Sequence, residues 1–181
     1  MLRGIYNRIR YLITSIKPEK DLRDVSAYKV HPSAMVYNKE NVLLADSSLV
    51  AEFVIIRAPL AKVEVGENSQ IGPFGVLLAG EYGIRIGDNV MIAPHCVIAA
   101  GNHEFRDLSV PMRFAGSFSD GPVIIEDDVW IGANCTICDN VKISKGAIIG
   151  ANSMVNKDVD AYDIVGGIPA KKISSRLKFK Q

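Results

Sequence analysis

The chain has 181 residues, of which 48% are apolar and 23% are charged, and its formal net charge is +1. This balance gives no bulk electrostatic reason to bind nucleic acid. No apolar run approaches the roughly 20 residues that a membrane-spanning helix requires. Arg8 and Arg10 interrupt the first apolar stretch, which therefore does not resemble a signal peptide. We expect a cytoplasmic protein with one main domain.

Residues 1–18 have the pattern of an amphipathic helix that Pro18 ends. Apolar side chains recur at helical steps and form one stripe, namely Leu2, Ile5, Tyr6, Ile9, Leu12, Ile13 and Ile16. The opposite face is basic, with Arg3, Arg8, Arg10 and Lys17. The helix either packs on its own domain or a neighbouring subunit, or holds weakly to the acidic inner face of the cell membrane. The pattern leaves both interpretations open.

Residues 19–173 contain a six-residue repeat. Aliphatic residues stand at every sixth position without a slip at Ile125, Ile131, Ile137, Ile143, Ile149 and Val155. The same template fits Ile86, Ile92 and Ile98, and again Val65, Ile71 and Leu77, with a looser version at Val30, Val36, Val50 and Ile56. Turn residues such as Gly, Asn and Asp fall between them.

A period of six matches neither an α-helix nor a simple hairpin. One short extended segment plus one tight turn takes six residues, so three repeats close a triangular coil whose aliphatic residues stack on the next coil. The sequence therefore predicts an all-β fold, a parallel β-helix over residues 19–173. The helix at 1–18 and the tail at 174–181 are candidate caps for its ends.

The repeat stops after Ile98 and resumes at Ile125, and residues 102–122 form an excursion loop. A non-repetitive segment of this length in an ordered domain is usually functional. His103, near its start, has the side chain that best serves as a general base near neutral pH, although an ordinary loop histidine is the alternative. Glu104 is a possible helper. Phe105, Arg106 and Arg113 suit a sugar ring or a diphosphate, or packing between subunits.

Three segments carry a family resemblance: IGDNVMIAPHCVIAAGNH, VWIGANCTI and IIGANSMVNKDVDAYDIVGGIPAKKI. Over Val65 to Ile173 the chain resembles the hexapeptide-repeat acetyltransferases, in the sugar and polysaccharide O-acetyltransferase branch related to the galactoside, maltose and nodulation-factor enzymes. The resemblance implies a left-handed β-helix, a homotrimer with active sites between subunits, acetyl-CoA as donor and no metal. It assigns His103 as the base that deprotonates the acceptor hydroxyl.

The resemblance also implies donor-binding residues: Trp130, Ala133, Ala151, Asn156, Lys157 and Lys171. Asn156 and Lys157 match a Thr-Lys pair near the nucleotide end of coenzyme A, and Lys171 matches an arginine that meets a phosphate. Two positions depart from the galactoside class. Ser174 replaces a basic contact, which leaves Lys172 or Arg176 to substitute, and Gly75 replaces an asparagine that touches the sugar. The acceptor is therefore open.

The favoured function is direct acetyl transfer to a sugar hydroxyl of a surface polysaccharide, such as lipopolysaccharide, or of its activated precursor. N-acetylation of an amino-sugar nucleotide is the alternative. A non-catalytic scaffold and a zinc hydratase are less favoured. The hydratase would need His31, His95 and His103 together as ligands. Cys96, Cys135 and Cys138 are expected to be reduced structural thiols.

Overall fold

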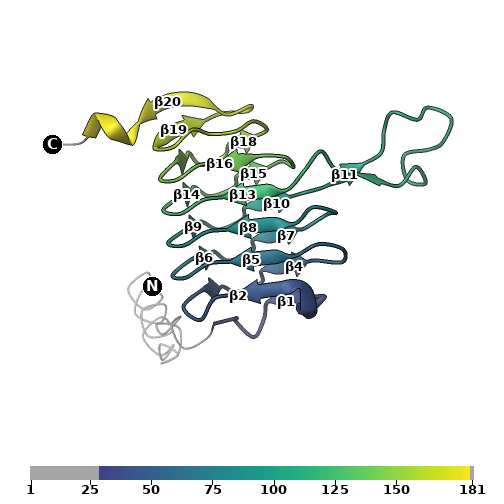
Figure 1. Ribbon diagram of the computed structural model, residues 1–181, viewed down its shortest axis with the longest axis horizontal. Coiled ribbons are helices and arrows are strands. Elements are labelled where there is room, and N and C mark those ends of the chain that lie inside the picture. The colour runs from purple at the N-terminus through teal and green to yellow at the C-terminus, as the bar shows by residue number, and fades with distance from the viewer. Residues whose placement is uncertain (1–28, 180–181) are drawn as a thin grey trace, which may run out of the picture.

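The computed structural model describes residues 29–179 and shows a triangular prism of stacked coils (Figure 1). The amphipathic helix expected at 1–18 lies outside the described residues. The β-helix expected from the six-residue repeat is confirmed, because three parallel sheets form the three sides of the prism. Within residues 29–179 no helix is long and apolar enough to cross a membrane.

Each sheet takes one short strand from each coil. Sheet I contains β1 (Met35–Tyr37), β4 (Ile55–Arg57), β7 (Val76–Leu78), β10 (Val97–Ala99), β15 (Thr136–Ile137) and β18 (Met154–Val155). Sheet II contains β2 (Val42–Leu44), β5 (Val63–Val65), β8 (Ile84–Ile86), β13 (Val123–Ile125) and β16 (Lys142–Ile143). Sheet III contains β3 (Leu49–Val50), β6 (Gln70–Ile71), β9 (Met91–Ile92), β14 (Trp130–Ile131), β17 (Ile148–Ile149), β19 (Asp163–Gly166) and the antiparallel β20 (Lys171–Ser175).

The repeat positions form the core. In sheet I, Ile137 pairs in register with Ile98 on one side and Val155 on the other, so like side chains stack through the prism. The six repeat residues from Ile125 to Val155 are all buried. Each such side chain contributes roughly 1.5–3 kcal/mol by its burial. Strands of two or three residues are stable here because every one continues a column.

The corner between sheets III and I requires the left-handed backbone conformation. In successive coils this position has φ between 56° and 61° and is occupied by Phe53, Phe74, His95, Asn134 and Asn152. Asparagine tolerates that conformation, whereas bulky side chains rarely adopt it. The rings compensate by stacking, with centroids 5.0 Å apart for Phe53 and Phe74 and 4.9 Å apart for Phe74 and His95. His95 is thus an exposed corner residue at the end of an aromatic ladder.

The C-terminal end of the prism is closed by its own chain. Strand β20 folds back on β19 and ends at Ser175, and the 3-10 helix η3 (Arg176–Phe179) follows. Arg176 fixes this cap, because its Nη1 lies 2.9 Å from Oδ2 of Asp128 and donates to the Gly146 carbonyl at 2.8 Å. Beneath the cap, Val155, Val159 and Val165 are buried.

Candidate active site

The excursion loop leaves the prism at the corner between sheets I and II, after β10, and returns at β13 (Figure 1). Its two ends pair as an antiparallel hairpin of β11 (Asn102–His103) and β12 (Ser117–Phe118), in which His103 lies opposite Ser117. The hairpin was not predicted from the sequence. It carries the central segment of the loop away from the coils.

A close glycine contact forms the floor of the loop. Gly80, in the coil below, has φ of 57°, and a Cβ on it would lie 1.9 Å from the carbonyl oxygen of Ala100. A Cβ on Gly101 would in turn lie 3.3 Å from Cα of Gly80. Only residues without side chains permit this approach. The loop base therefore rests directly on the preceding coil.

Hydrogen bonds to the coils above and below fix both strands of the hairpin. Above, one carboxylate holds both ends of the loop, since Oδ1 of Asp139 accepts from Nδ2 of Asn102 at 2.8 Å and Oδ2 accepts from the Asp120 amide, two residues after β12, at 2.9 Å. Below, Ser117 donates to Oε1 of Glu81 at 2.9 Å. His103 is consequently attached to a rigid base, although it lies in a protruding loop.

The imidazole of His103 is exposed on this base. Among residues 29–179, no side chain forms a hydrogen bond or ion pair with it. A histidine in this state is available to take a proton from an incoming group.

Glu104 is oriented toward Arg106 and not toward His103. Its Oε1 accepts from Nε of Arg106 at 2.8 Å, and Oε2 forms an ion pair with the same guanidinium. The hydrogen bonds from the side chain and backbone of Arg106 lower the pKa of Glu104 to about 2. The helper role therefore stays a prediction, and this geometry gives Glu104 a different partner.

The acceptor-side candidates gather around one ring of the hairpin. Arg106 lies over Phe118, with its Cζ 4.1 Å from the ring centroid, and Phe105 meets the same ring edge-on at 6.4 Å. Arg113 lies farther along the loop and is exposed. The exposed apolar side chains Leu108 and Phe114 accompany it. The far part of the loop thus exposes apolar and cationic side chains at its surface.

Three of the predicted donor residues lie on sheet III or at the corner between sheets III and I. Trp130 projects from β14 and is 48% exposed. Ala133 and Ala151 occupy successive coils of the corner, where the Asn152 amide donates to the Ala133 carbonyl at 2.8 Å. A Cβ on Gly132 would lie 2.6 Å from the Ala151 nitrogen, so this corner is unusually tight. A ligand can approach its backbone closely there.

The other predicted donor residues divide between the two edges of sheet I. Asn156 and Lys157 are exposed at the corner between sheets I and II, one coil above Asp139. Lys171 is exposed in β20, next to Ala170, whose amide donates to Met154. Within one chain the face of sheet I therefore separates Ala133, Ala151 and Lys171 from the edge that carries His103, Asn156 and Lys157.

The sequence did not indicate three residues at the base of the loop, namely Asp139, Glu81 and Gly80. Each of them resembles an ordinary turn residue.

The three histidines lie apart from one another. His31 lies in the first coil, His95 at the end of the aromatic ladder and His103 in the loop. No group of three potential ligand side chains able to hold a metal occurs in residues 29–179. The three cysteines are free thiols, and the hydrogen bond with Cys135, together with burial, raises the pKa of Cys96.

The stacked coils, the corner excursion and the tight corners define a hexapeptide-repeat transferase. The family described as "Bacterial transferase hexapeptide (six repeats)" matches residues 122–157. An N-acyltransferase from Bacillus cereus, AntD, solved with dTDP-4-amino-4,6-dideoxyglucose and coenzyme A, is 30% identical, with a TM-score of 0.73, over 81% of this chain and 80% of that one. The chain therefore belongs to the hexapeptide-repeat transferase family, as its sequence predicted.

Two further solved structures are similar. A hexapeptide-repeat acetyltransferase from Vibrio cholerae O1 biovar eltor, complexed with acetyl-coenzyme A, is 32% identical over 75% of this chain and 70% of that one, with a TM-score of 0.64. The polySia-specific acetyltransferase NeuO is 27% identical over 74% of this chain and 61% of that one, with a TM-score of 0.62. The chain spans about a quarter, 27%, of the length of the first curated relatives that it matches.

Proposed function

We propose that this protein is an acetyl-CoA-dependent O-acetyltransferase acting on a sugar hydroxyl of a surface polysaccharide or its activated precursor. The observation that carries the proposal is the exposed His103 imidazole, held on a clamped hairpin at the single long excursion of the described coils. Relatives that bind acetyl-coenzyme A or coenzyme A share the fold. A scaffold has no requirement for an imidazole held in this way.

In the proposed step, a ring nitrogen of His103 takes the proton of the acceptor hydroxyl while that oxygen attacks the thioester carbonyl. The tetrahedral intermediate then collapses, the carbon–sulfur bond breaks, and the imidazolium returns the proton to the sulfur of coenzyme A. Such a base contributes about 10²–10⁴-fold to the rate. Alignment of the two substrates supplies much of the remainder.

N-acetylation of an amino-sugar nucleotide is the second candidate, and the similarity to AntD favours it, because that enzyme was solved with an amino-sugar nucleotide. The same base and donor serve both reactions. An amine acceptor gives a stable amide, whereas a hydroxyl acceptor gives a base-labile ester. The product therefore distinguishes the two candidates directly.

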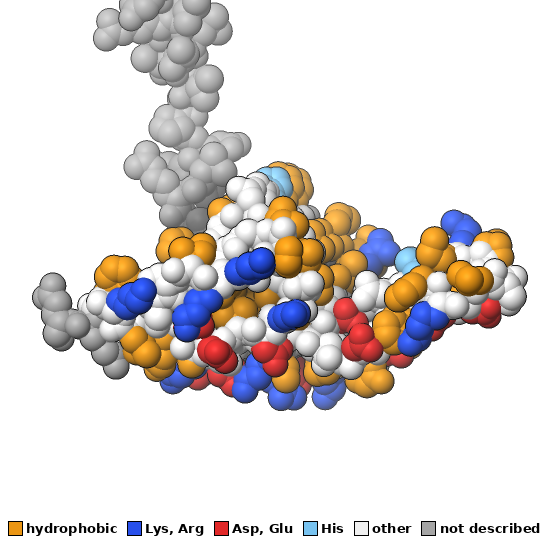
Figure 2. Space-filling model, turned by 90° about the horizontal axis from the view of Figure 1, so that it is seen from above, with side chains coloured by type: hydrophobic (Ala, Val, Ile, Leu, Met, Phe, Trp, Pro, Cys, Tyr) orange, Lys and Arg blue, Asp and Glu red, His pale blue; other side chains and the backbone are white. Residues whose placement is uncertain are grey.

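We further propose that the active unit is a homotrimer in which sheet I is covered. The outward positions of this sheet are largely apolar and include Met35, Tyr37, Ile55, Val76, Leu78, Val97, Ala99 and Met154. Sheet II instead carries ion pairs, with Glu64 and Arg85 at 3.1 Å and Glu126 and Lys142 at 2.7 Å. In Figure 2, hydrophobic side chains cover the sloping surface next to the projecting loop, and charged side chains lie along the lower edge of the molecule.

This assembly accounts for the separation of the predicted site residues. A second copy against sheet I brings its own corner residues, equivalent to Ala133 and Ala151, toward the His103 edge of the first copy. The donor then lies between two chains, with contacts from each. An apolar sheet face of this extent is typical of a protein–protein interface.

The test is acetyl transfer to a panel of activated sugars and amino sugars by wild-type protein and two histidine variants. His103→Ala is expected to lose 10²–10⁴-fold in kcat/KM with unchanged folding. His95→Asn is the matched control, because asparagine already occupies the same corner at Asn134 and Asn152. Equal activity of wild type and His103→Ala would remove His103 from the mechanism.

A further inference from the structure

The two ends of the prism are covered differently by residues 29–179. At the C-terminal end the last coil lies beneath β19, β20 and η3. At the N-terminal end the inward side chains of the first coil are only partly buried, although they continue the same columns. Val36 pairs in register with Ile56, which is fully buried, and Leu44 pairs with Val65.

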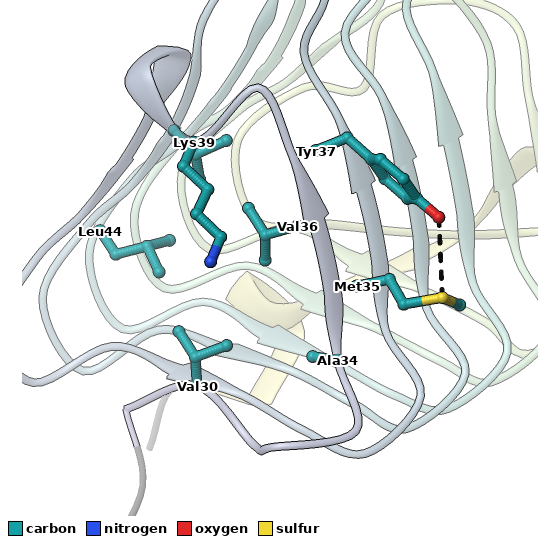
Figure 3. Close-up of a pocket in the computed structure, with 8 residues that line it drawn as sticks. Val30, Ala34, Met35, Val36, Tyr37, Lys39 and Leu44 are labelled. Atoms are coloured by element: carbon teal, nitrogen blue, oxygen red, sulfur yellow. Dashed lines mark hydrogen bonds between the residues drawn. The ribbon is translucent and has the colours of Figure 1, made fainter.

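These side chains line an open apolar hollow of about 520 Å³. Figure 3 shows Val30, Val36, Lys39 and Leu44 on one side of β1 and Met35 and Tyr37 on the other, and all of them line the hollow. An apolar cavity of about 150 Å³ holds a benzene ring, so this hollow has room for roughly three side chains of that size. Leaving it open to water is unfavourable.

We propose that the first segment of this same chain, residues 2–16, docks its apolar stripe into the hollow and closes the N-terminal end. The segment supplies seven apolar side chains on one predicted helical face: Leu2, Ile5, Tyr6, Ile9, Leu12, Ile13 and Ile16. A solenoid needs such a cap, because its terminal repeat has one uncovered side. The basic side chains of the segment then face water.

The chain itself brings this segment to the hollow. The described residues begin at Lys29, directly before Val30, which lines the hollow. A predicted helix of 15 residues is roughly 22 Å long, and the 12 residues from 17 to 28 span up to roughly 40 Å. The segment therefore reaches the hollow and can lie across it, at a high local concentration.

The shape of the surface favours this occupant over two others. In a two-fold contact between two copies at this end, the hollow of one copy faces the hollow of the other. Neither copy then supplies a protruding group to fill the hollow of its partner. A membrane receives protruding apolar groups, whereas these side chains line a recess. A separate helical stripe supplies the protrusion that the hollow lacks.

The test measures trypsin cleavage of the native 181-residue chain after Arg8, Arg10 and Lys17, followed by mass spectrometry. The double substitution Ile9→Asp and Ile13→Asp places charges in the stripe and is expected to increase the cleavage rate at least tenfold. The matched control, Asn7→Asp with Thr14→Asp, places the same charges on the opposite helical face. It is expected to leave the rate within about twofold, because that face stays in water.

The hollow provides the reciprocal test. Leu44→Asp is expected to accelerate cleavage at the same sites at least tenfold, whereas Leu43→Asp, the neighbouring outward residue of β2, is not. Should Leu44→Asp destabilise the first coil, the stripe variants still decide, because they leave the coils unchanged. The proposal is overturned if native protein is cleaved as fast as the free peptide of residues 1–20. It is equally overturned if protection requires high protein concentration or anionic vesicles.

Discussion

Substitution of Asp139 tests whether the loop base positions His103. The Asp139 carboxylate accepts one hydrogen bond from each side of the hairpin, from Asn102 at 2.8 Å and from the Asp120 amide at 2.9 Å. Asp139→Asn preserves the shape but replaces one acceptor oxygen with a donor NH₂ group. The single remaining oxygen accepts from only one of the two loop donors, and the bond to a charged oxygen is lost at the other.

The magnitude follows from the bond that is lost. A hydrogen bond to a charged group contributes about 1.5–3 kcal/mol, and the half-buried position of Asp139 favours the lower value. A loss of about 1.4 kcal/mol corresponds to a tenfold change in an equilibrium. We therefore expect the docked hairpin to be destabilised about tenfold and kcat to fall by up to that factor.

Steady-state kinetics with acetyl-CoA and hydrogen exchange over residues 102–120 provide the measurements. A positioning role predicts a lower kcat and faster hydrogen exchange in the loop. It also predicts an unchanged midpoint of the pH–rate profile, because the base itself is intact. Asp158→Asn is the matched control, because Asp158 occupies the same corner one coil above and accepts from the Lys142 amide at 2.8 Å without contacting the loop. An equal loss in Asp158→Asn, or none in Asp139→Asn, refutes the reasoning.

Two further variants test the chemistry and the assembly. The pKa of Glu104 is held at about 2 by Arg106, so its ionic stabilisation is complete above about pH 5 and is lost only as the pH falls toward 2. Glu104→Gln should therefore leave the midpoint of the pH–rate profile between pH 5 and 9 unchanged, and a shifted midpoint would instead establish a contact with His103. Val76→Asp, in the outward face of sheet I, should weaken the trimer roughly 100-fold or more in sedimentation experiments. Ile124→Asp, outward on sheet II, should not, and equal dissociation by both would exclude sheet I as the specific interface.

The coils were predictable because each repeat position has the same surroundings in every coil. Ile131, Ile137 and Ile143 are buried for the same reason, so one regular spacing predicts all three. The spacing of 18 residues per coil also relates Ala133 to Ala151, which the structure places in consecutive coils at one corner. Periodicity predicts which residues stack, even where it does not identify their roles.

The loop was predictable in its existence but not in its structure. Pairing of Asn102 with Phe118 joins residues across a segment that has no repeat, and no local pattern specifies it. The partner of Glu104 was missed for a different reason, because Arg106 is only two residues away and competes with His103 for the same carboxylate.

One sequence signal could have located the clamp. The repeat places residue 121 one coil below residue 139, and the Asn140 amide indeed donates to the Gly121 carbonyl at 3.1 Å. A polar side chain at position 139 therefore lies above the returning end of the loop. The arithmetic of the coil, applied to the residues that flank an insertion, identifies the groups that hold it.

The same arithmetic explains why the excursion occurs at this corner. Ile56 and Val65 are nine positions apart, as are Leu77 and Ile86, whereas Ile137 and Ile143 are only six apart. The corner between sheets I and II is therefore already widened in the two coils below the loop and tight in the coil above. The widened turn supplies Gly80 and Glu81 as a support, and the tight turn supplies Asp139 as a clamp. His103 therefore lies where a widened turn below and a tight turn above both contact the base of the loop.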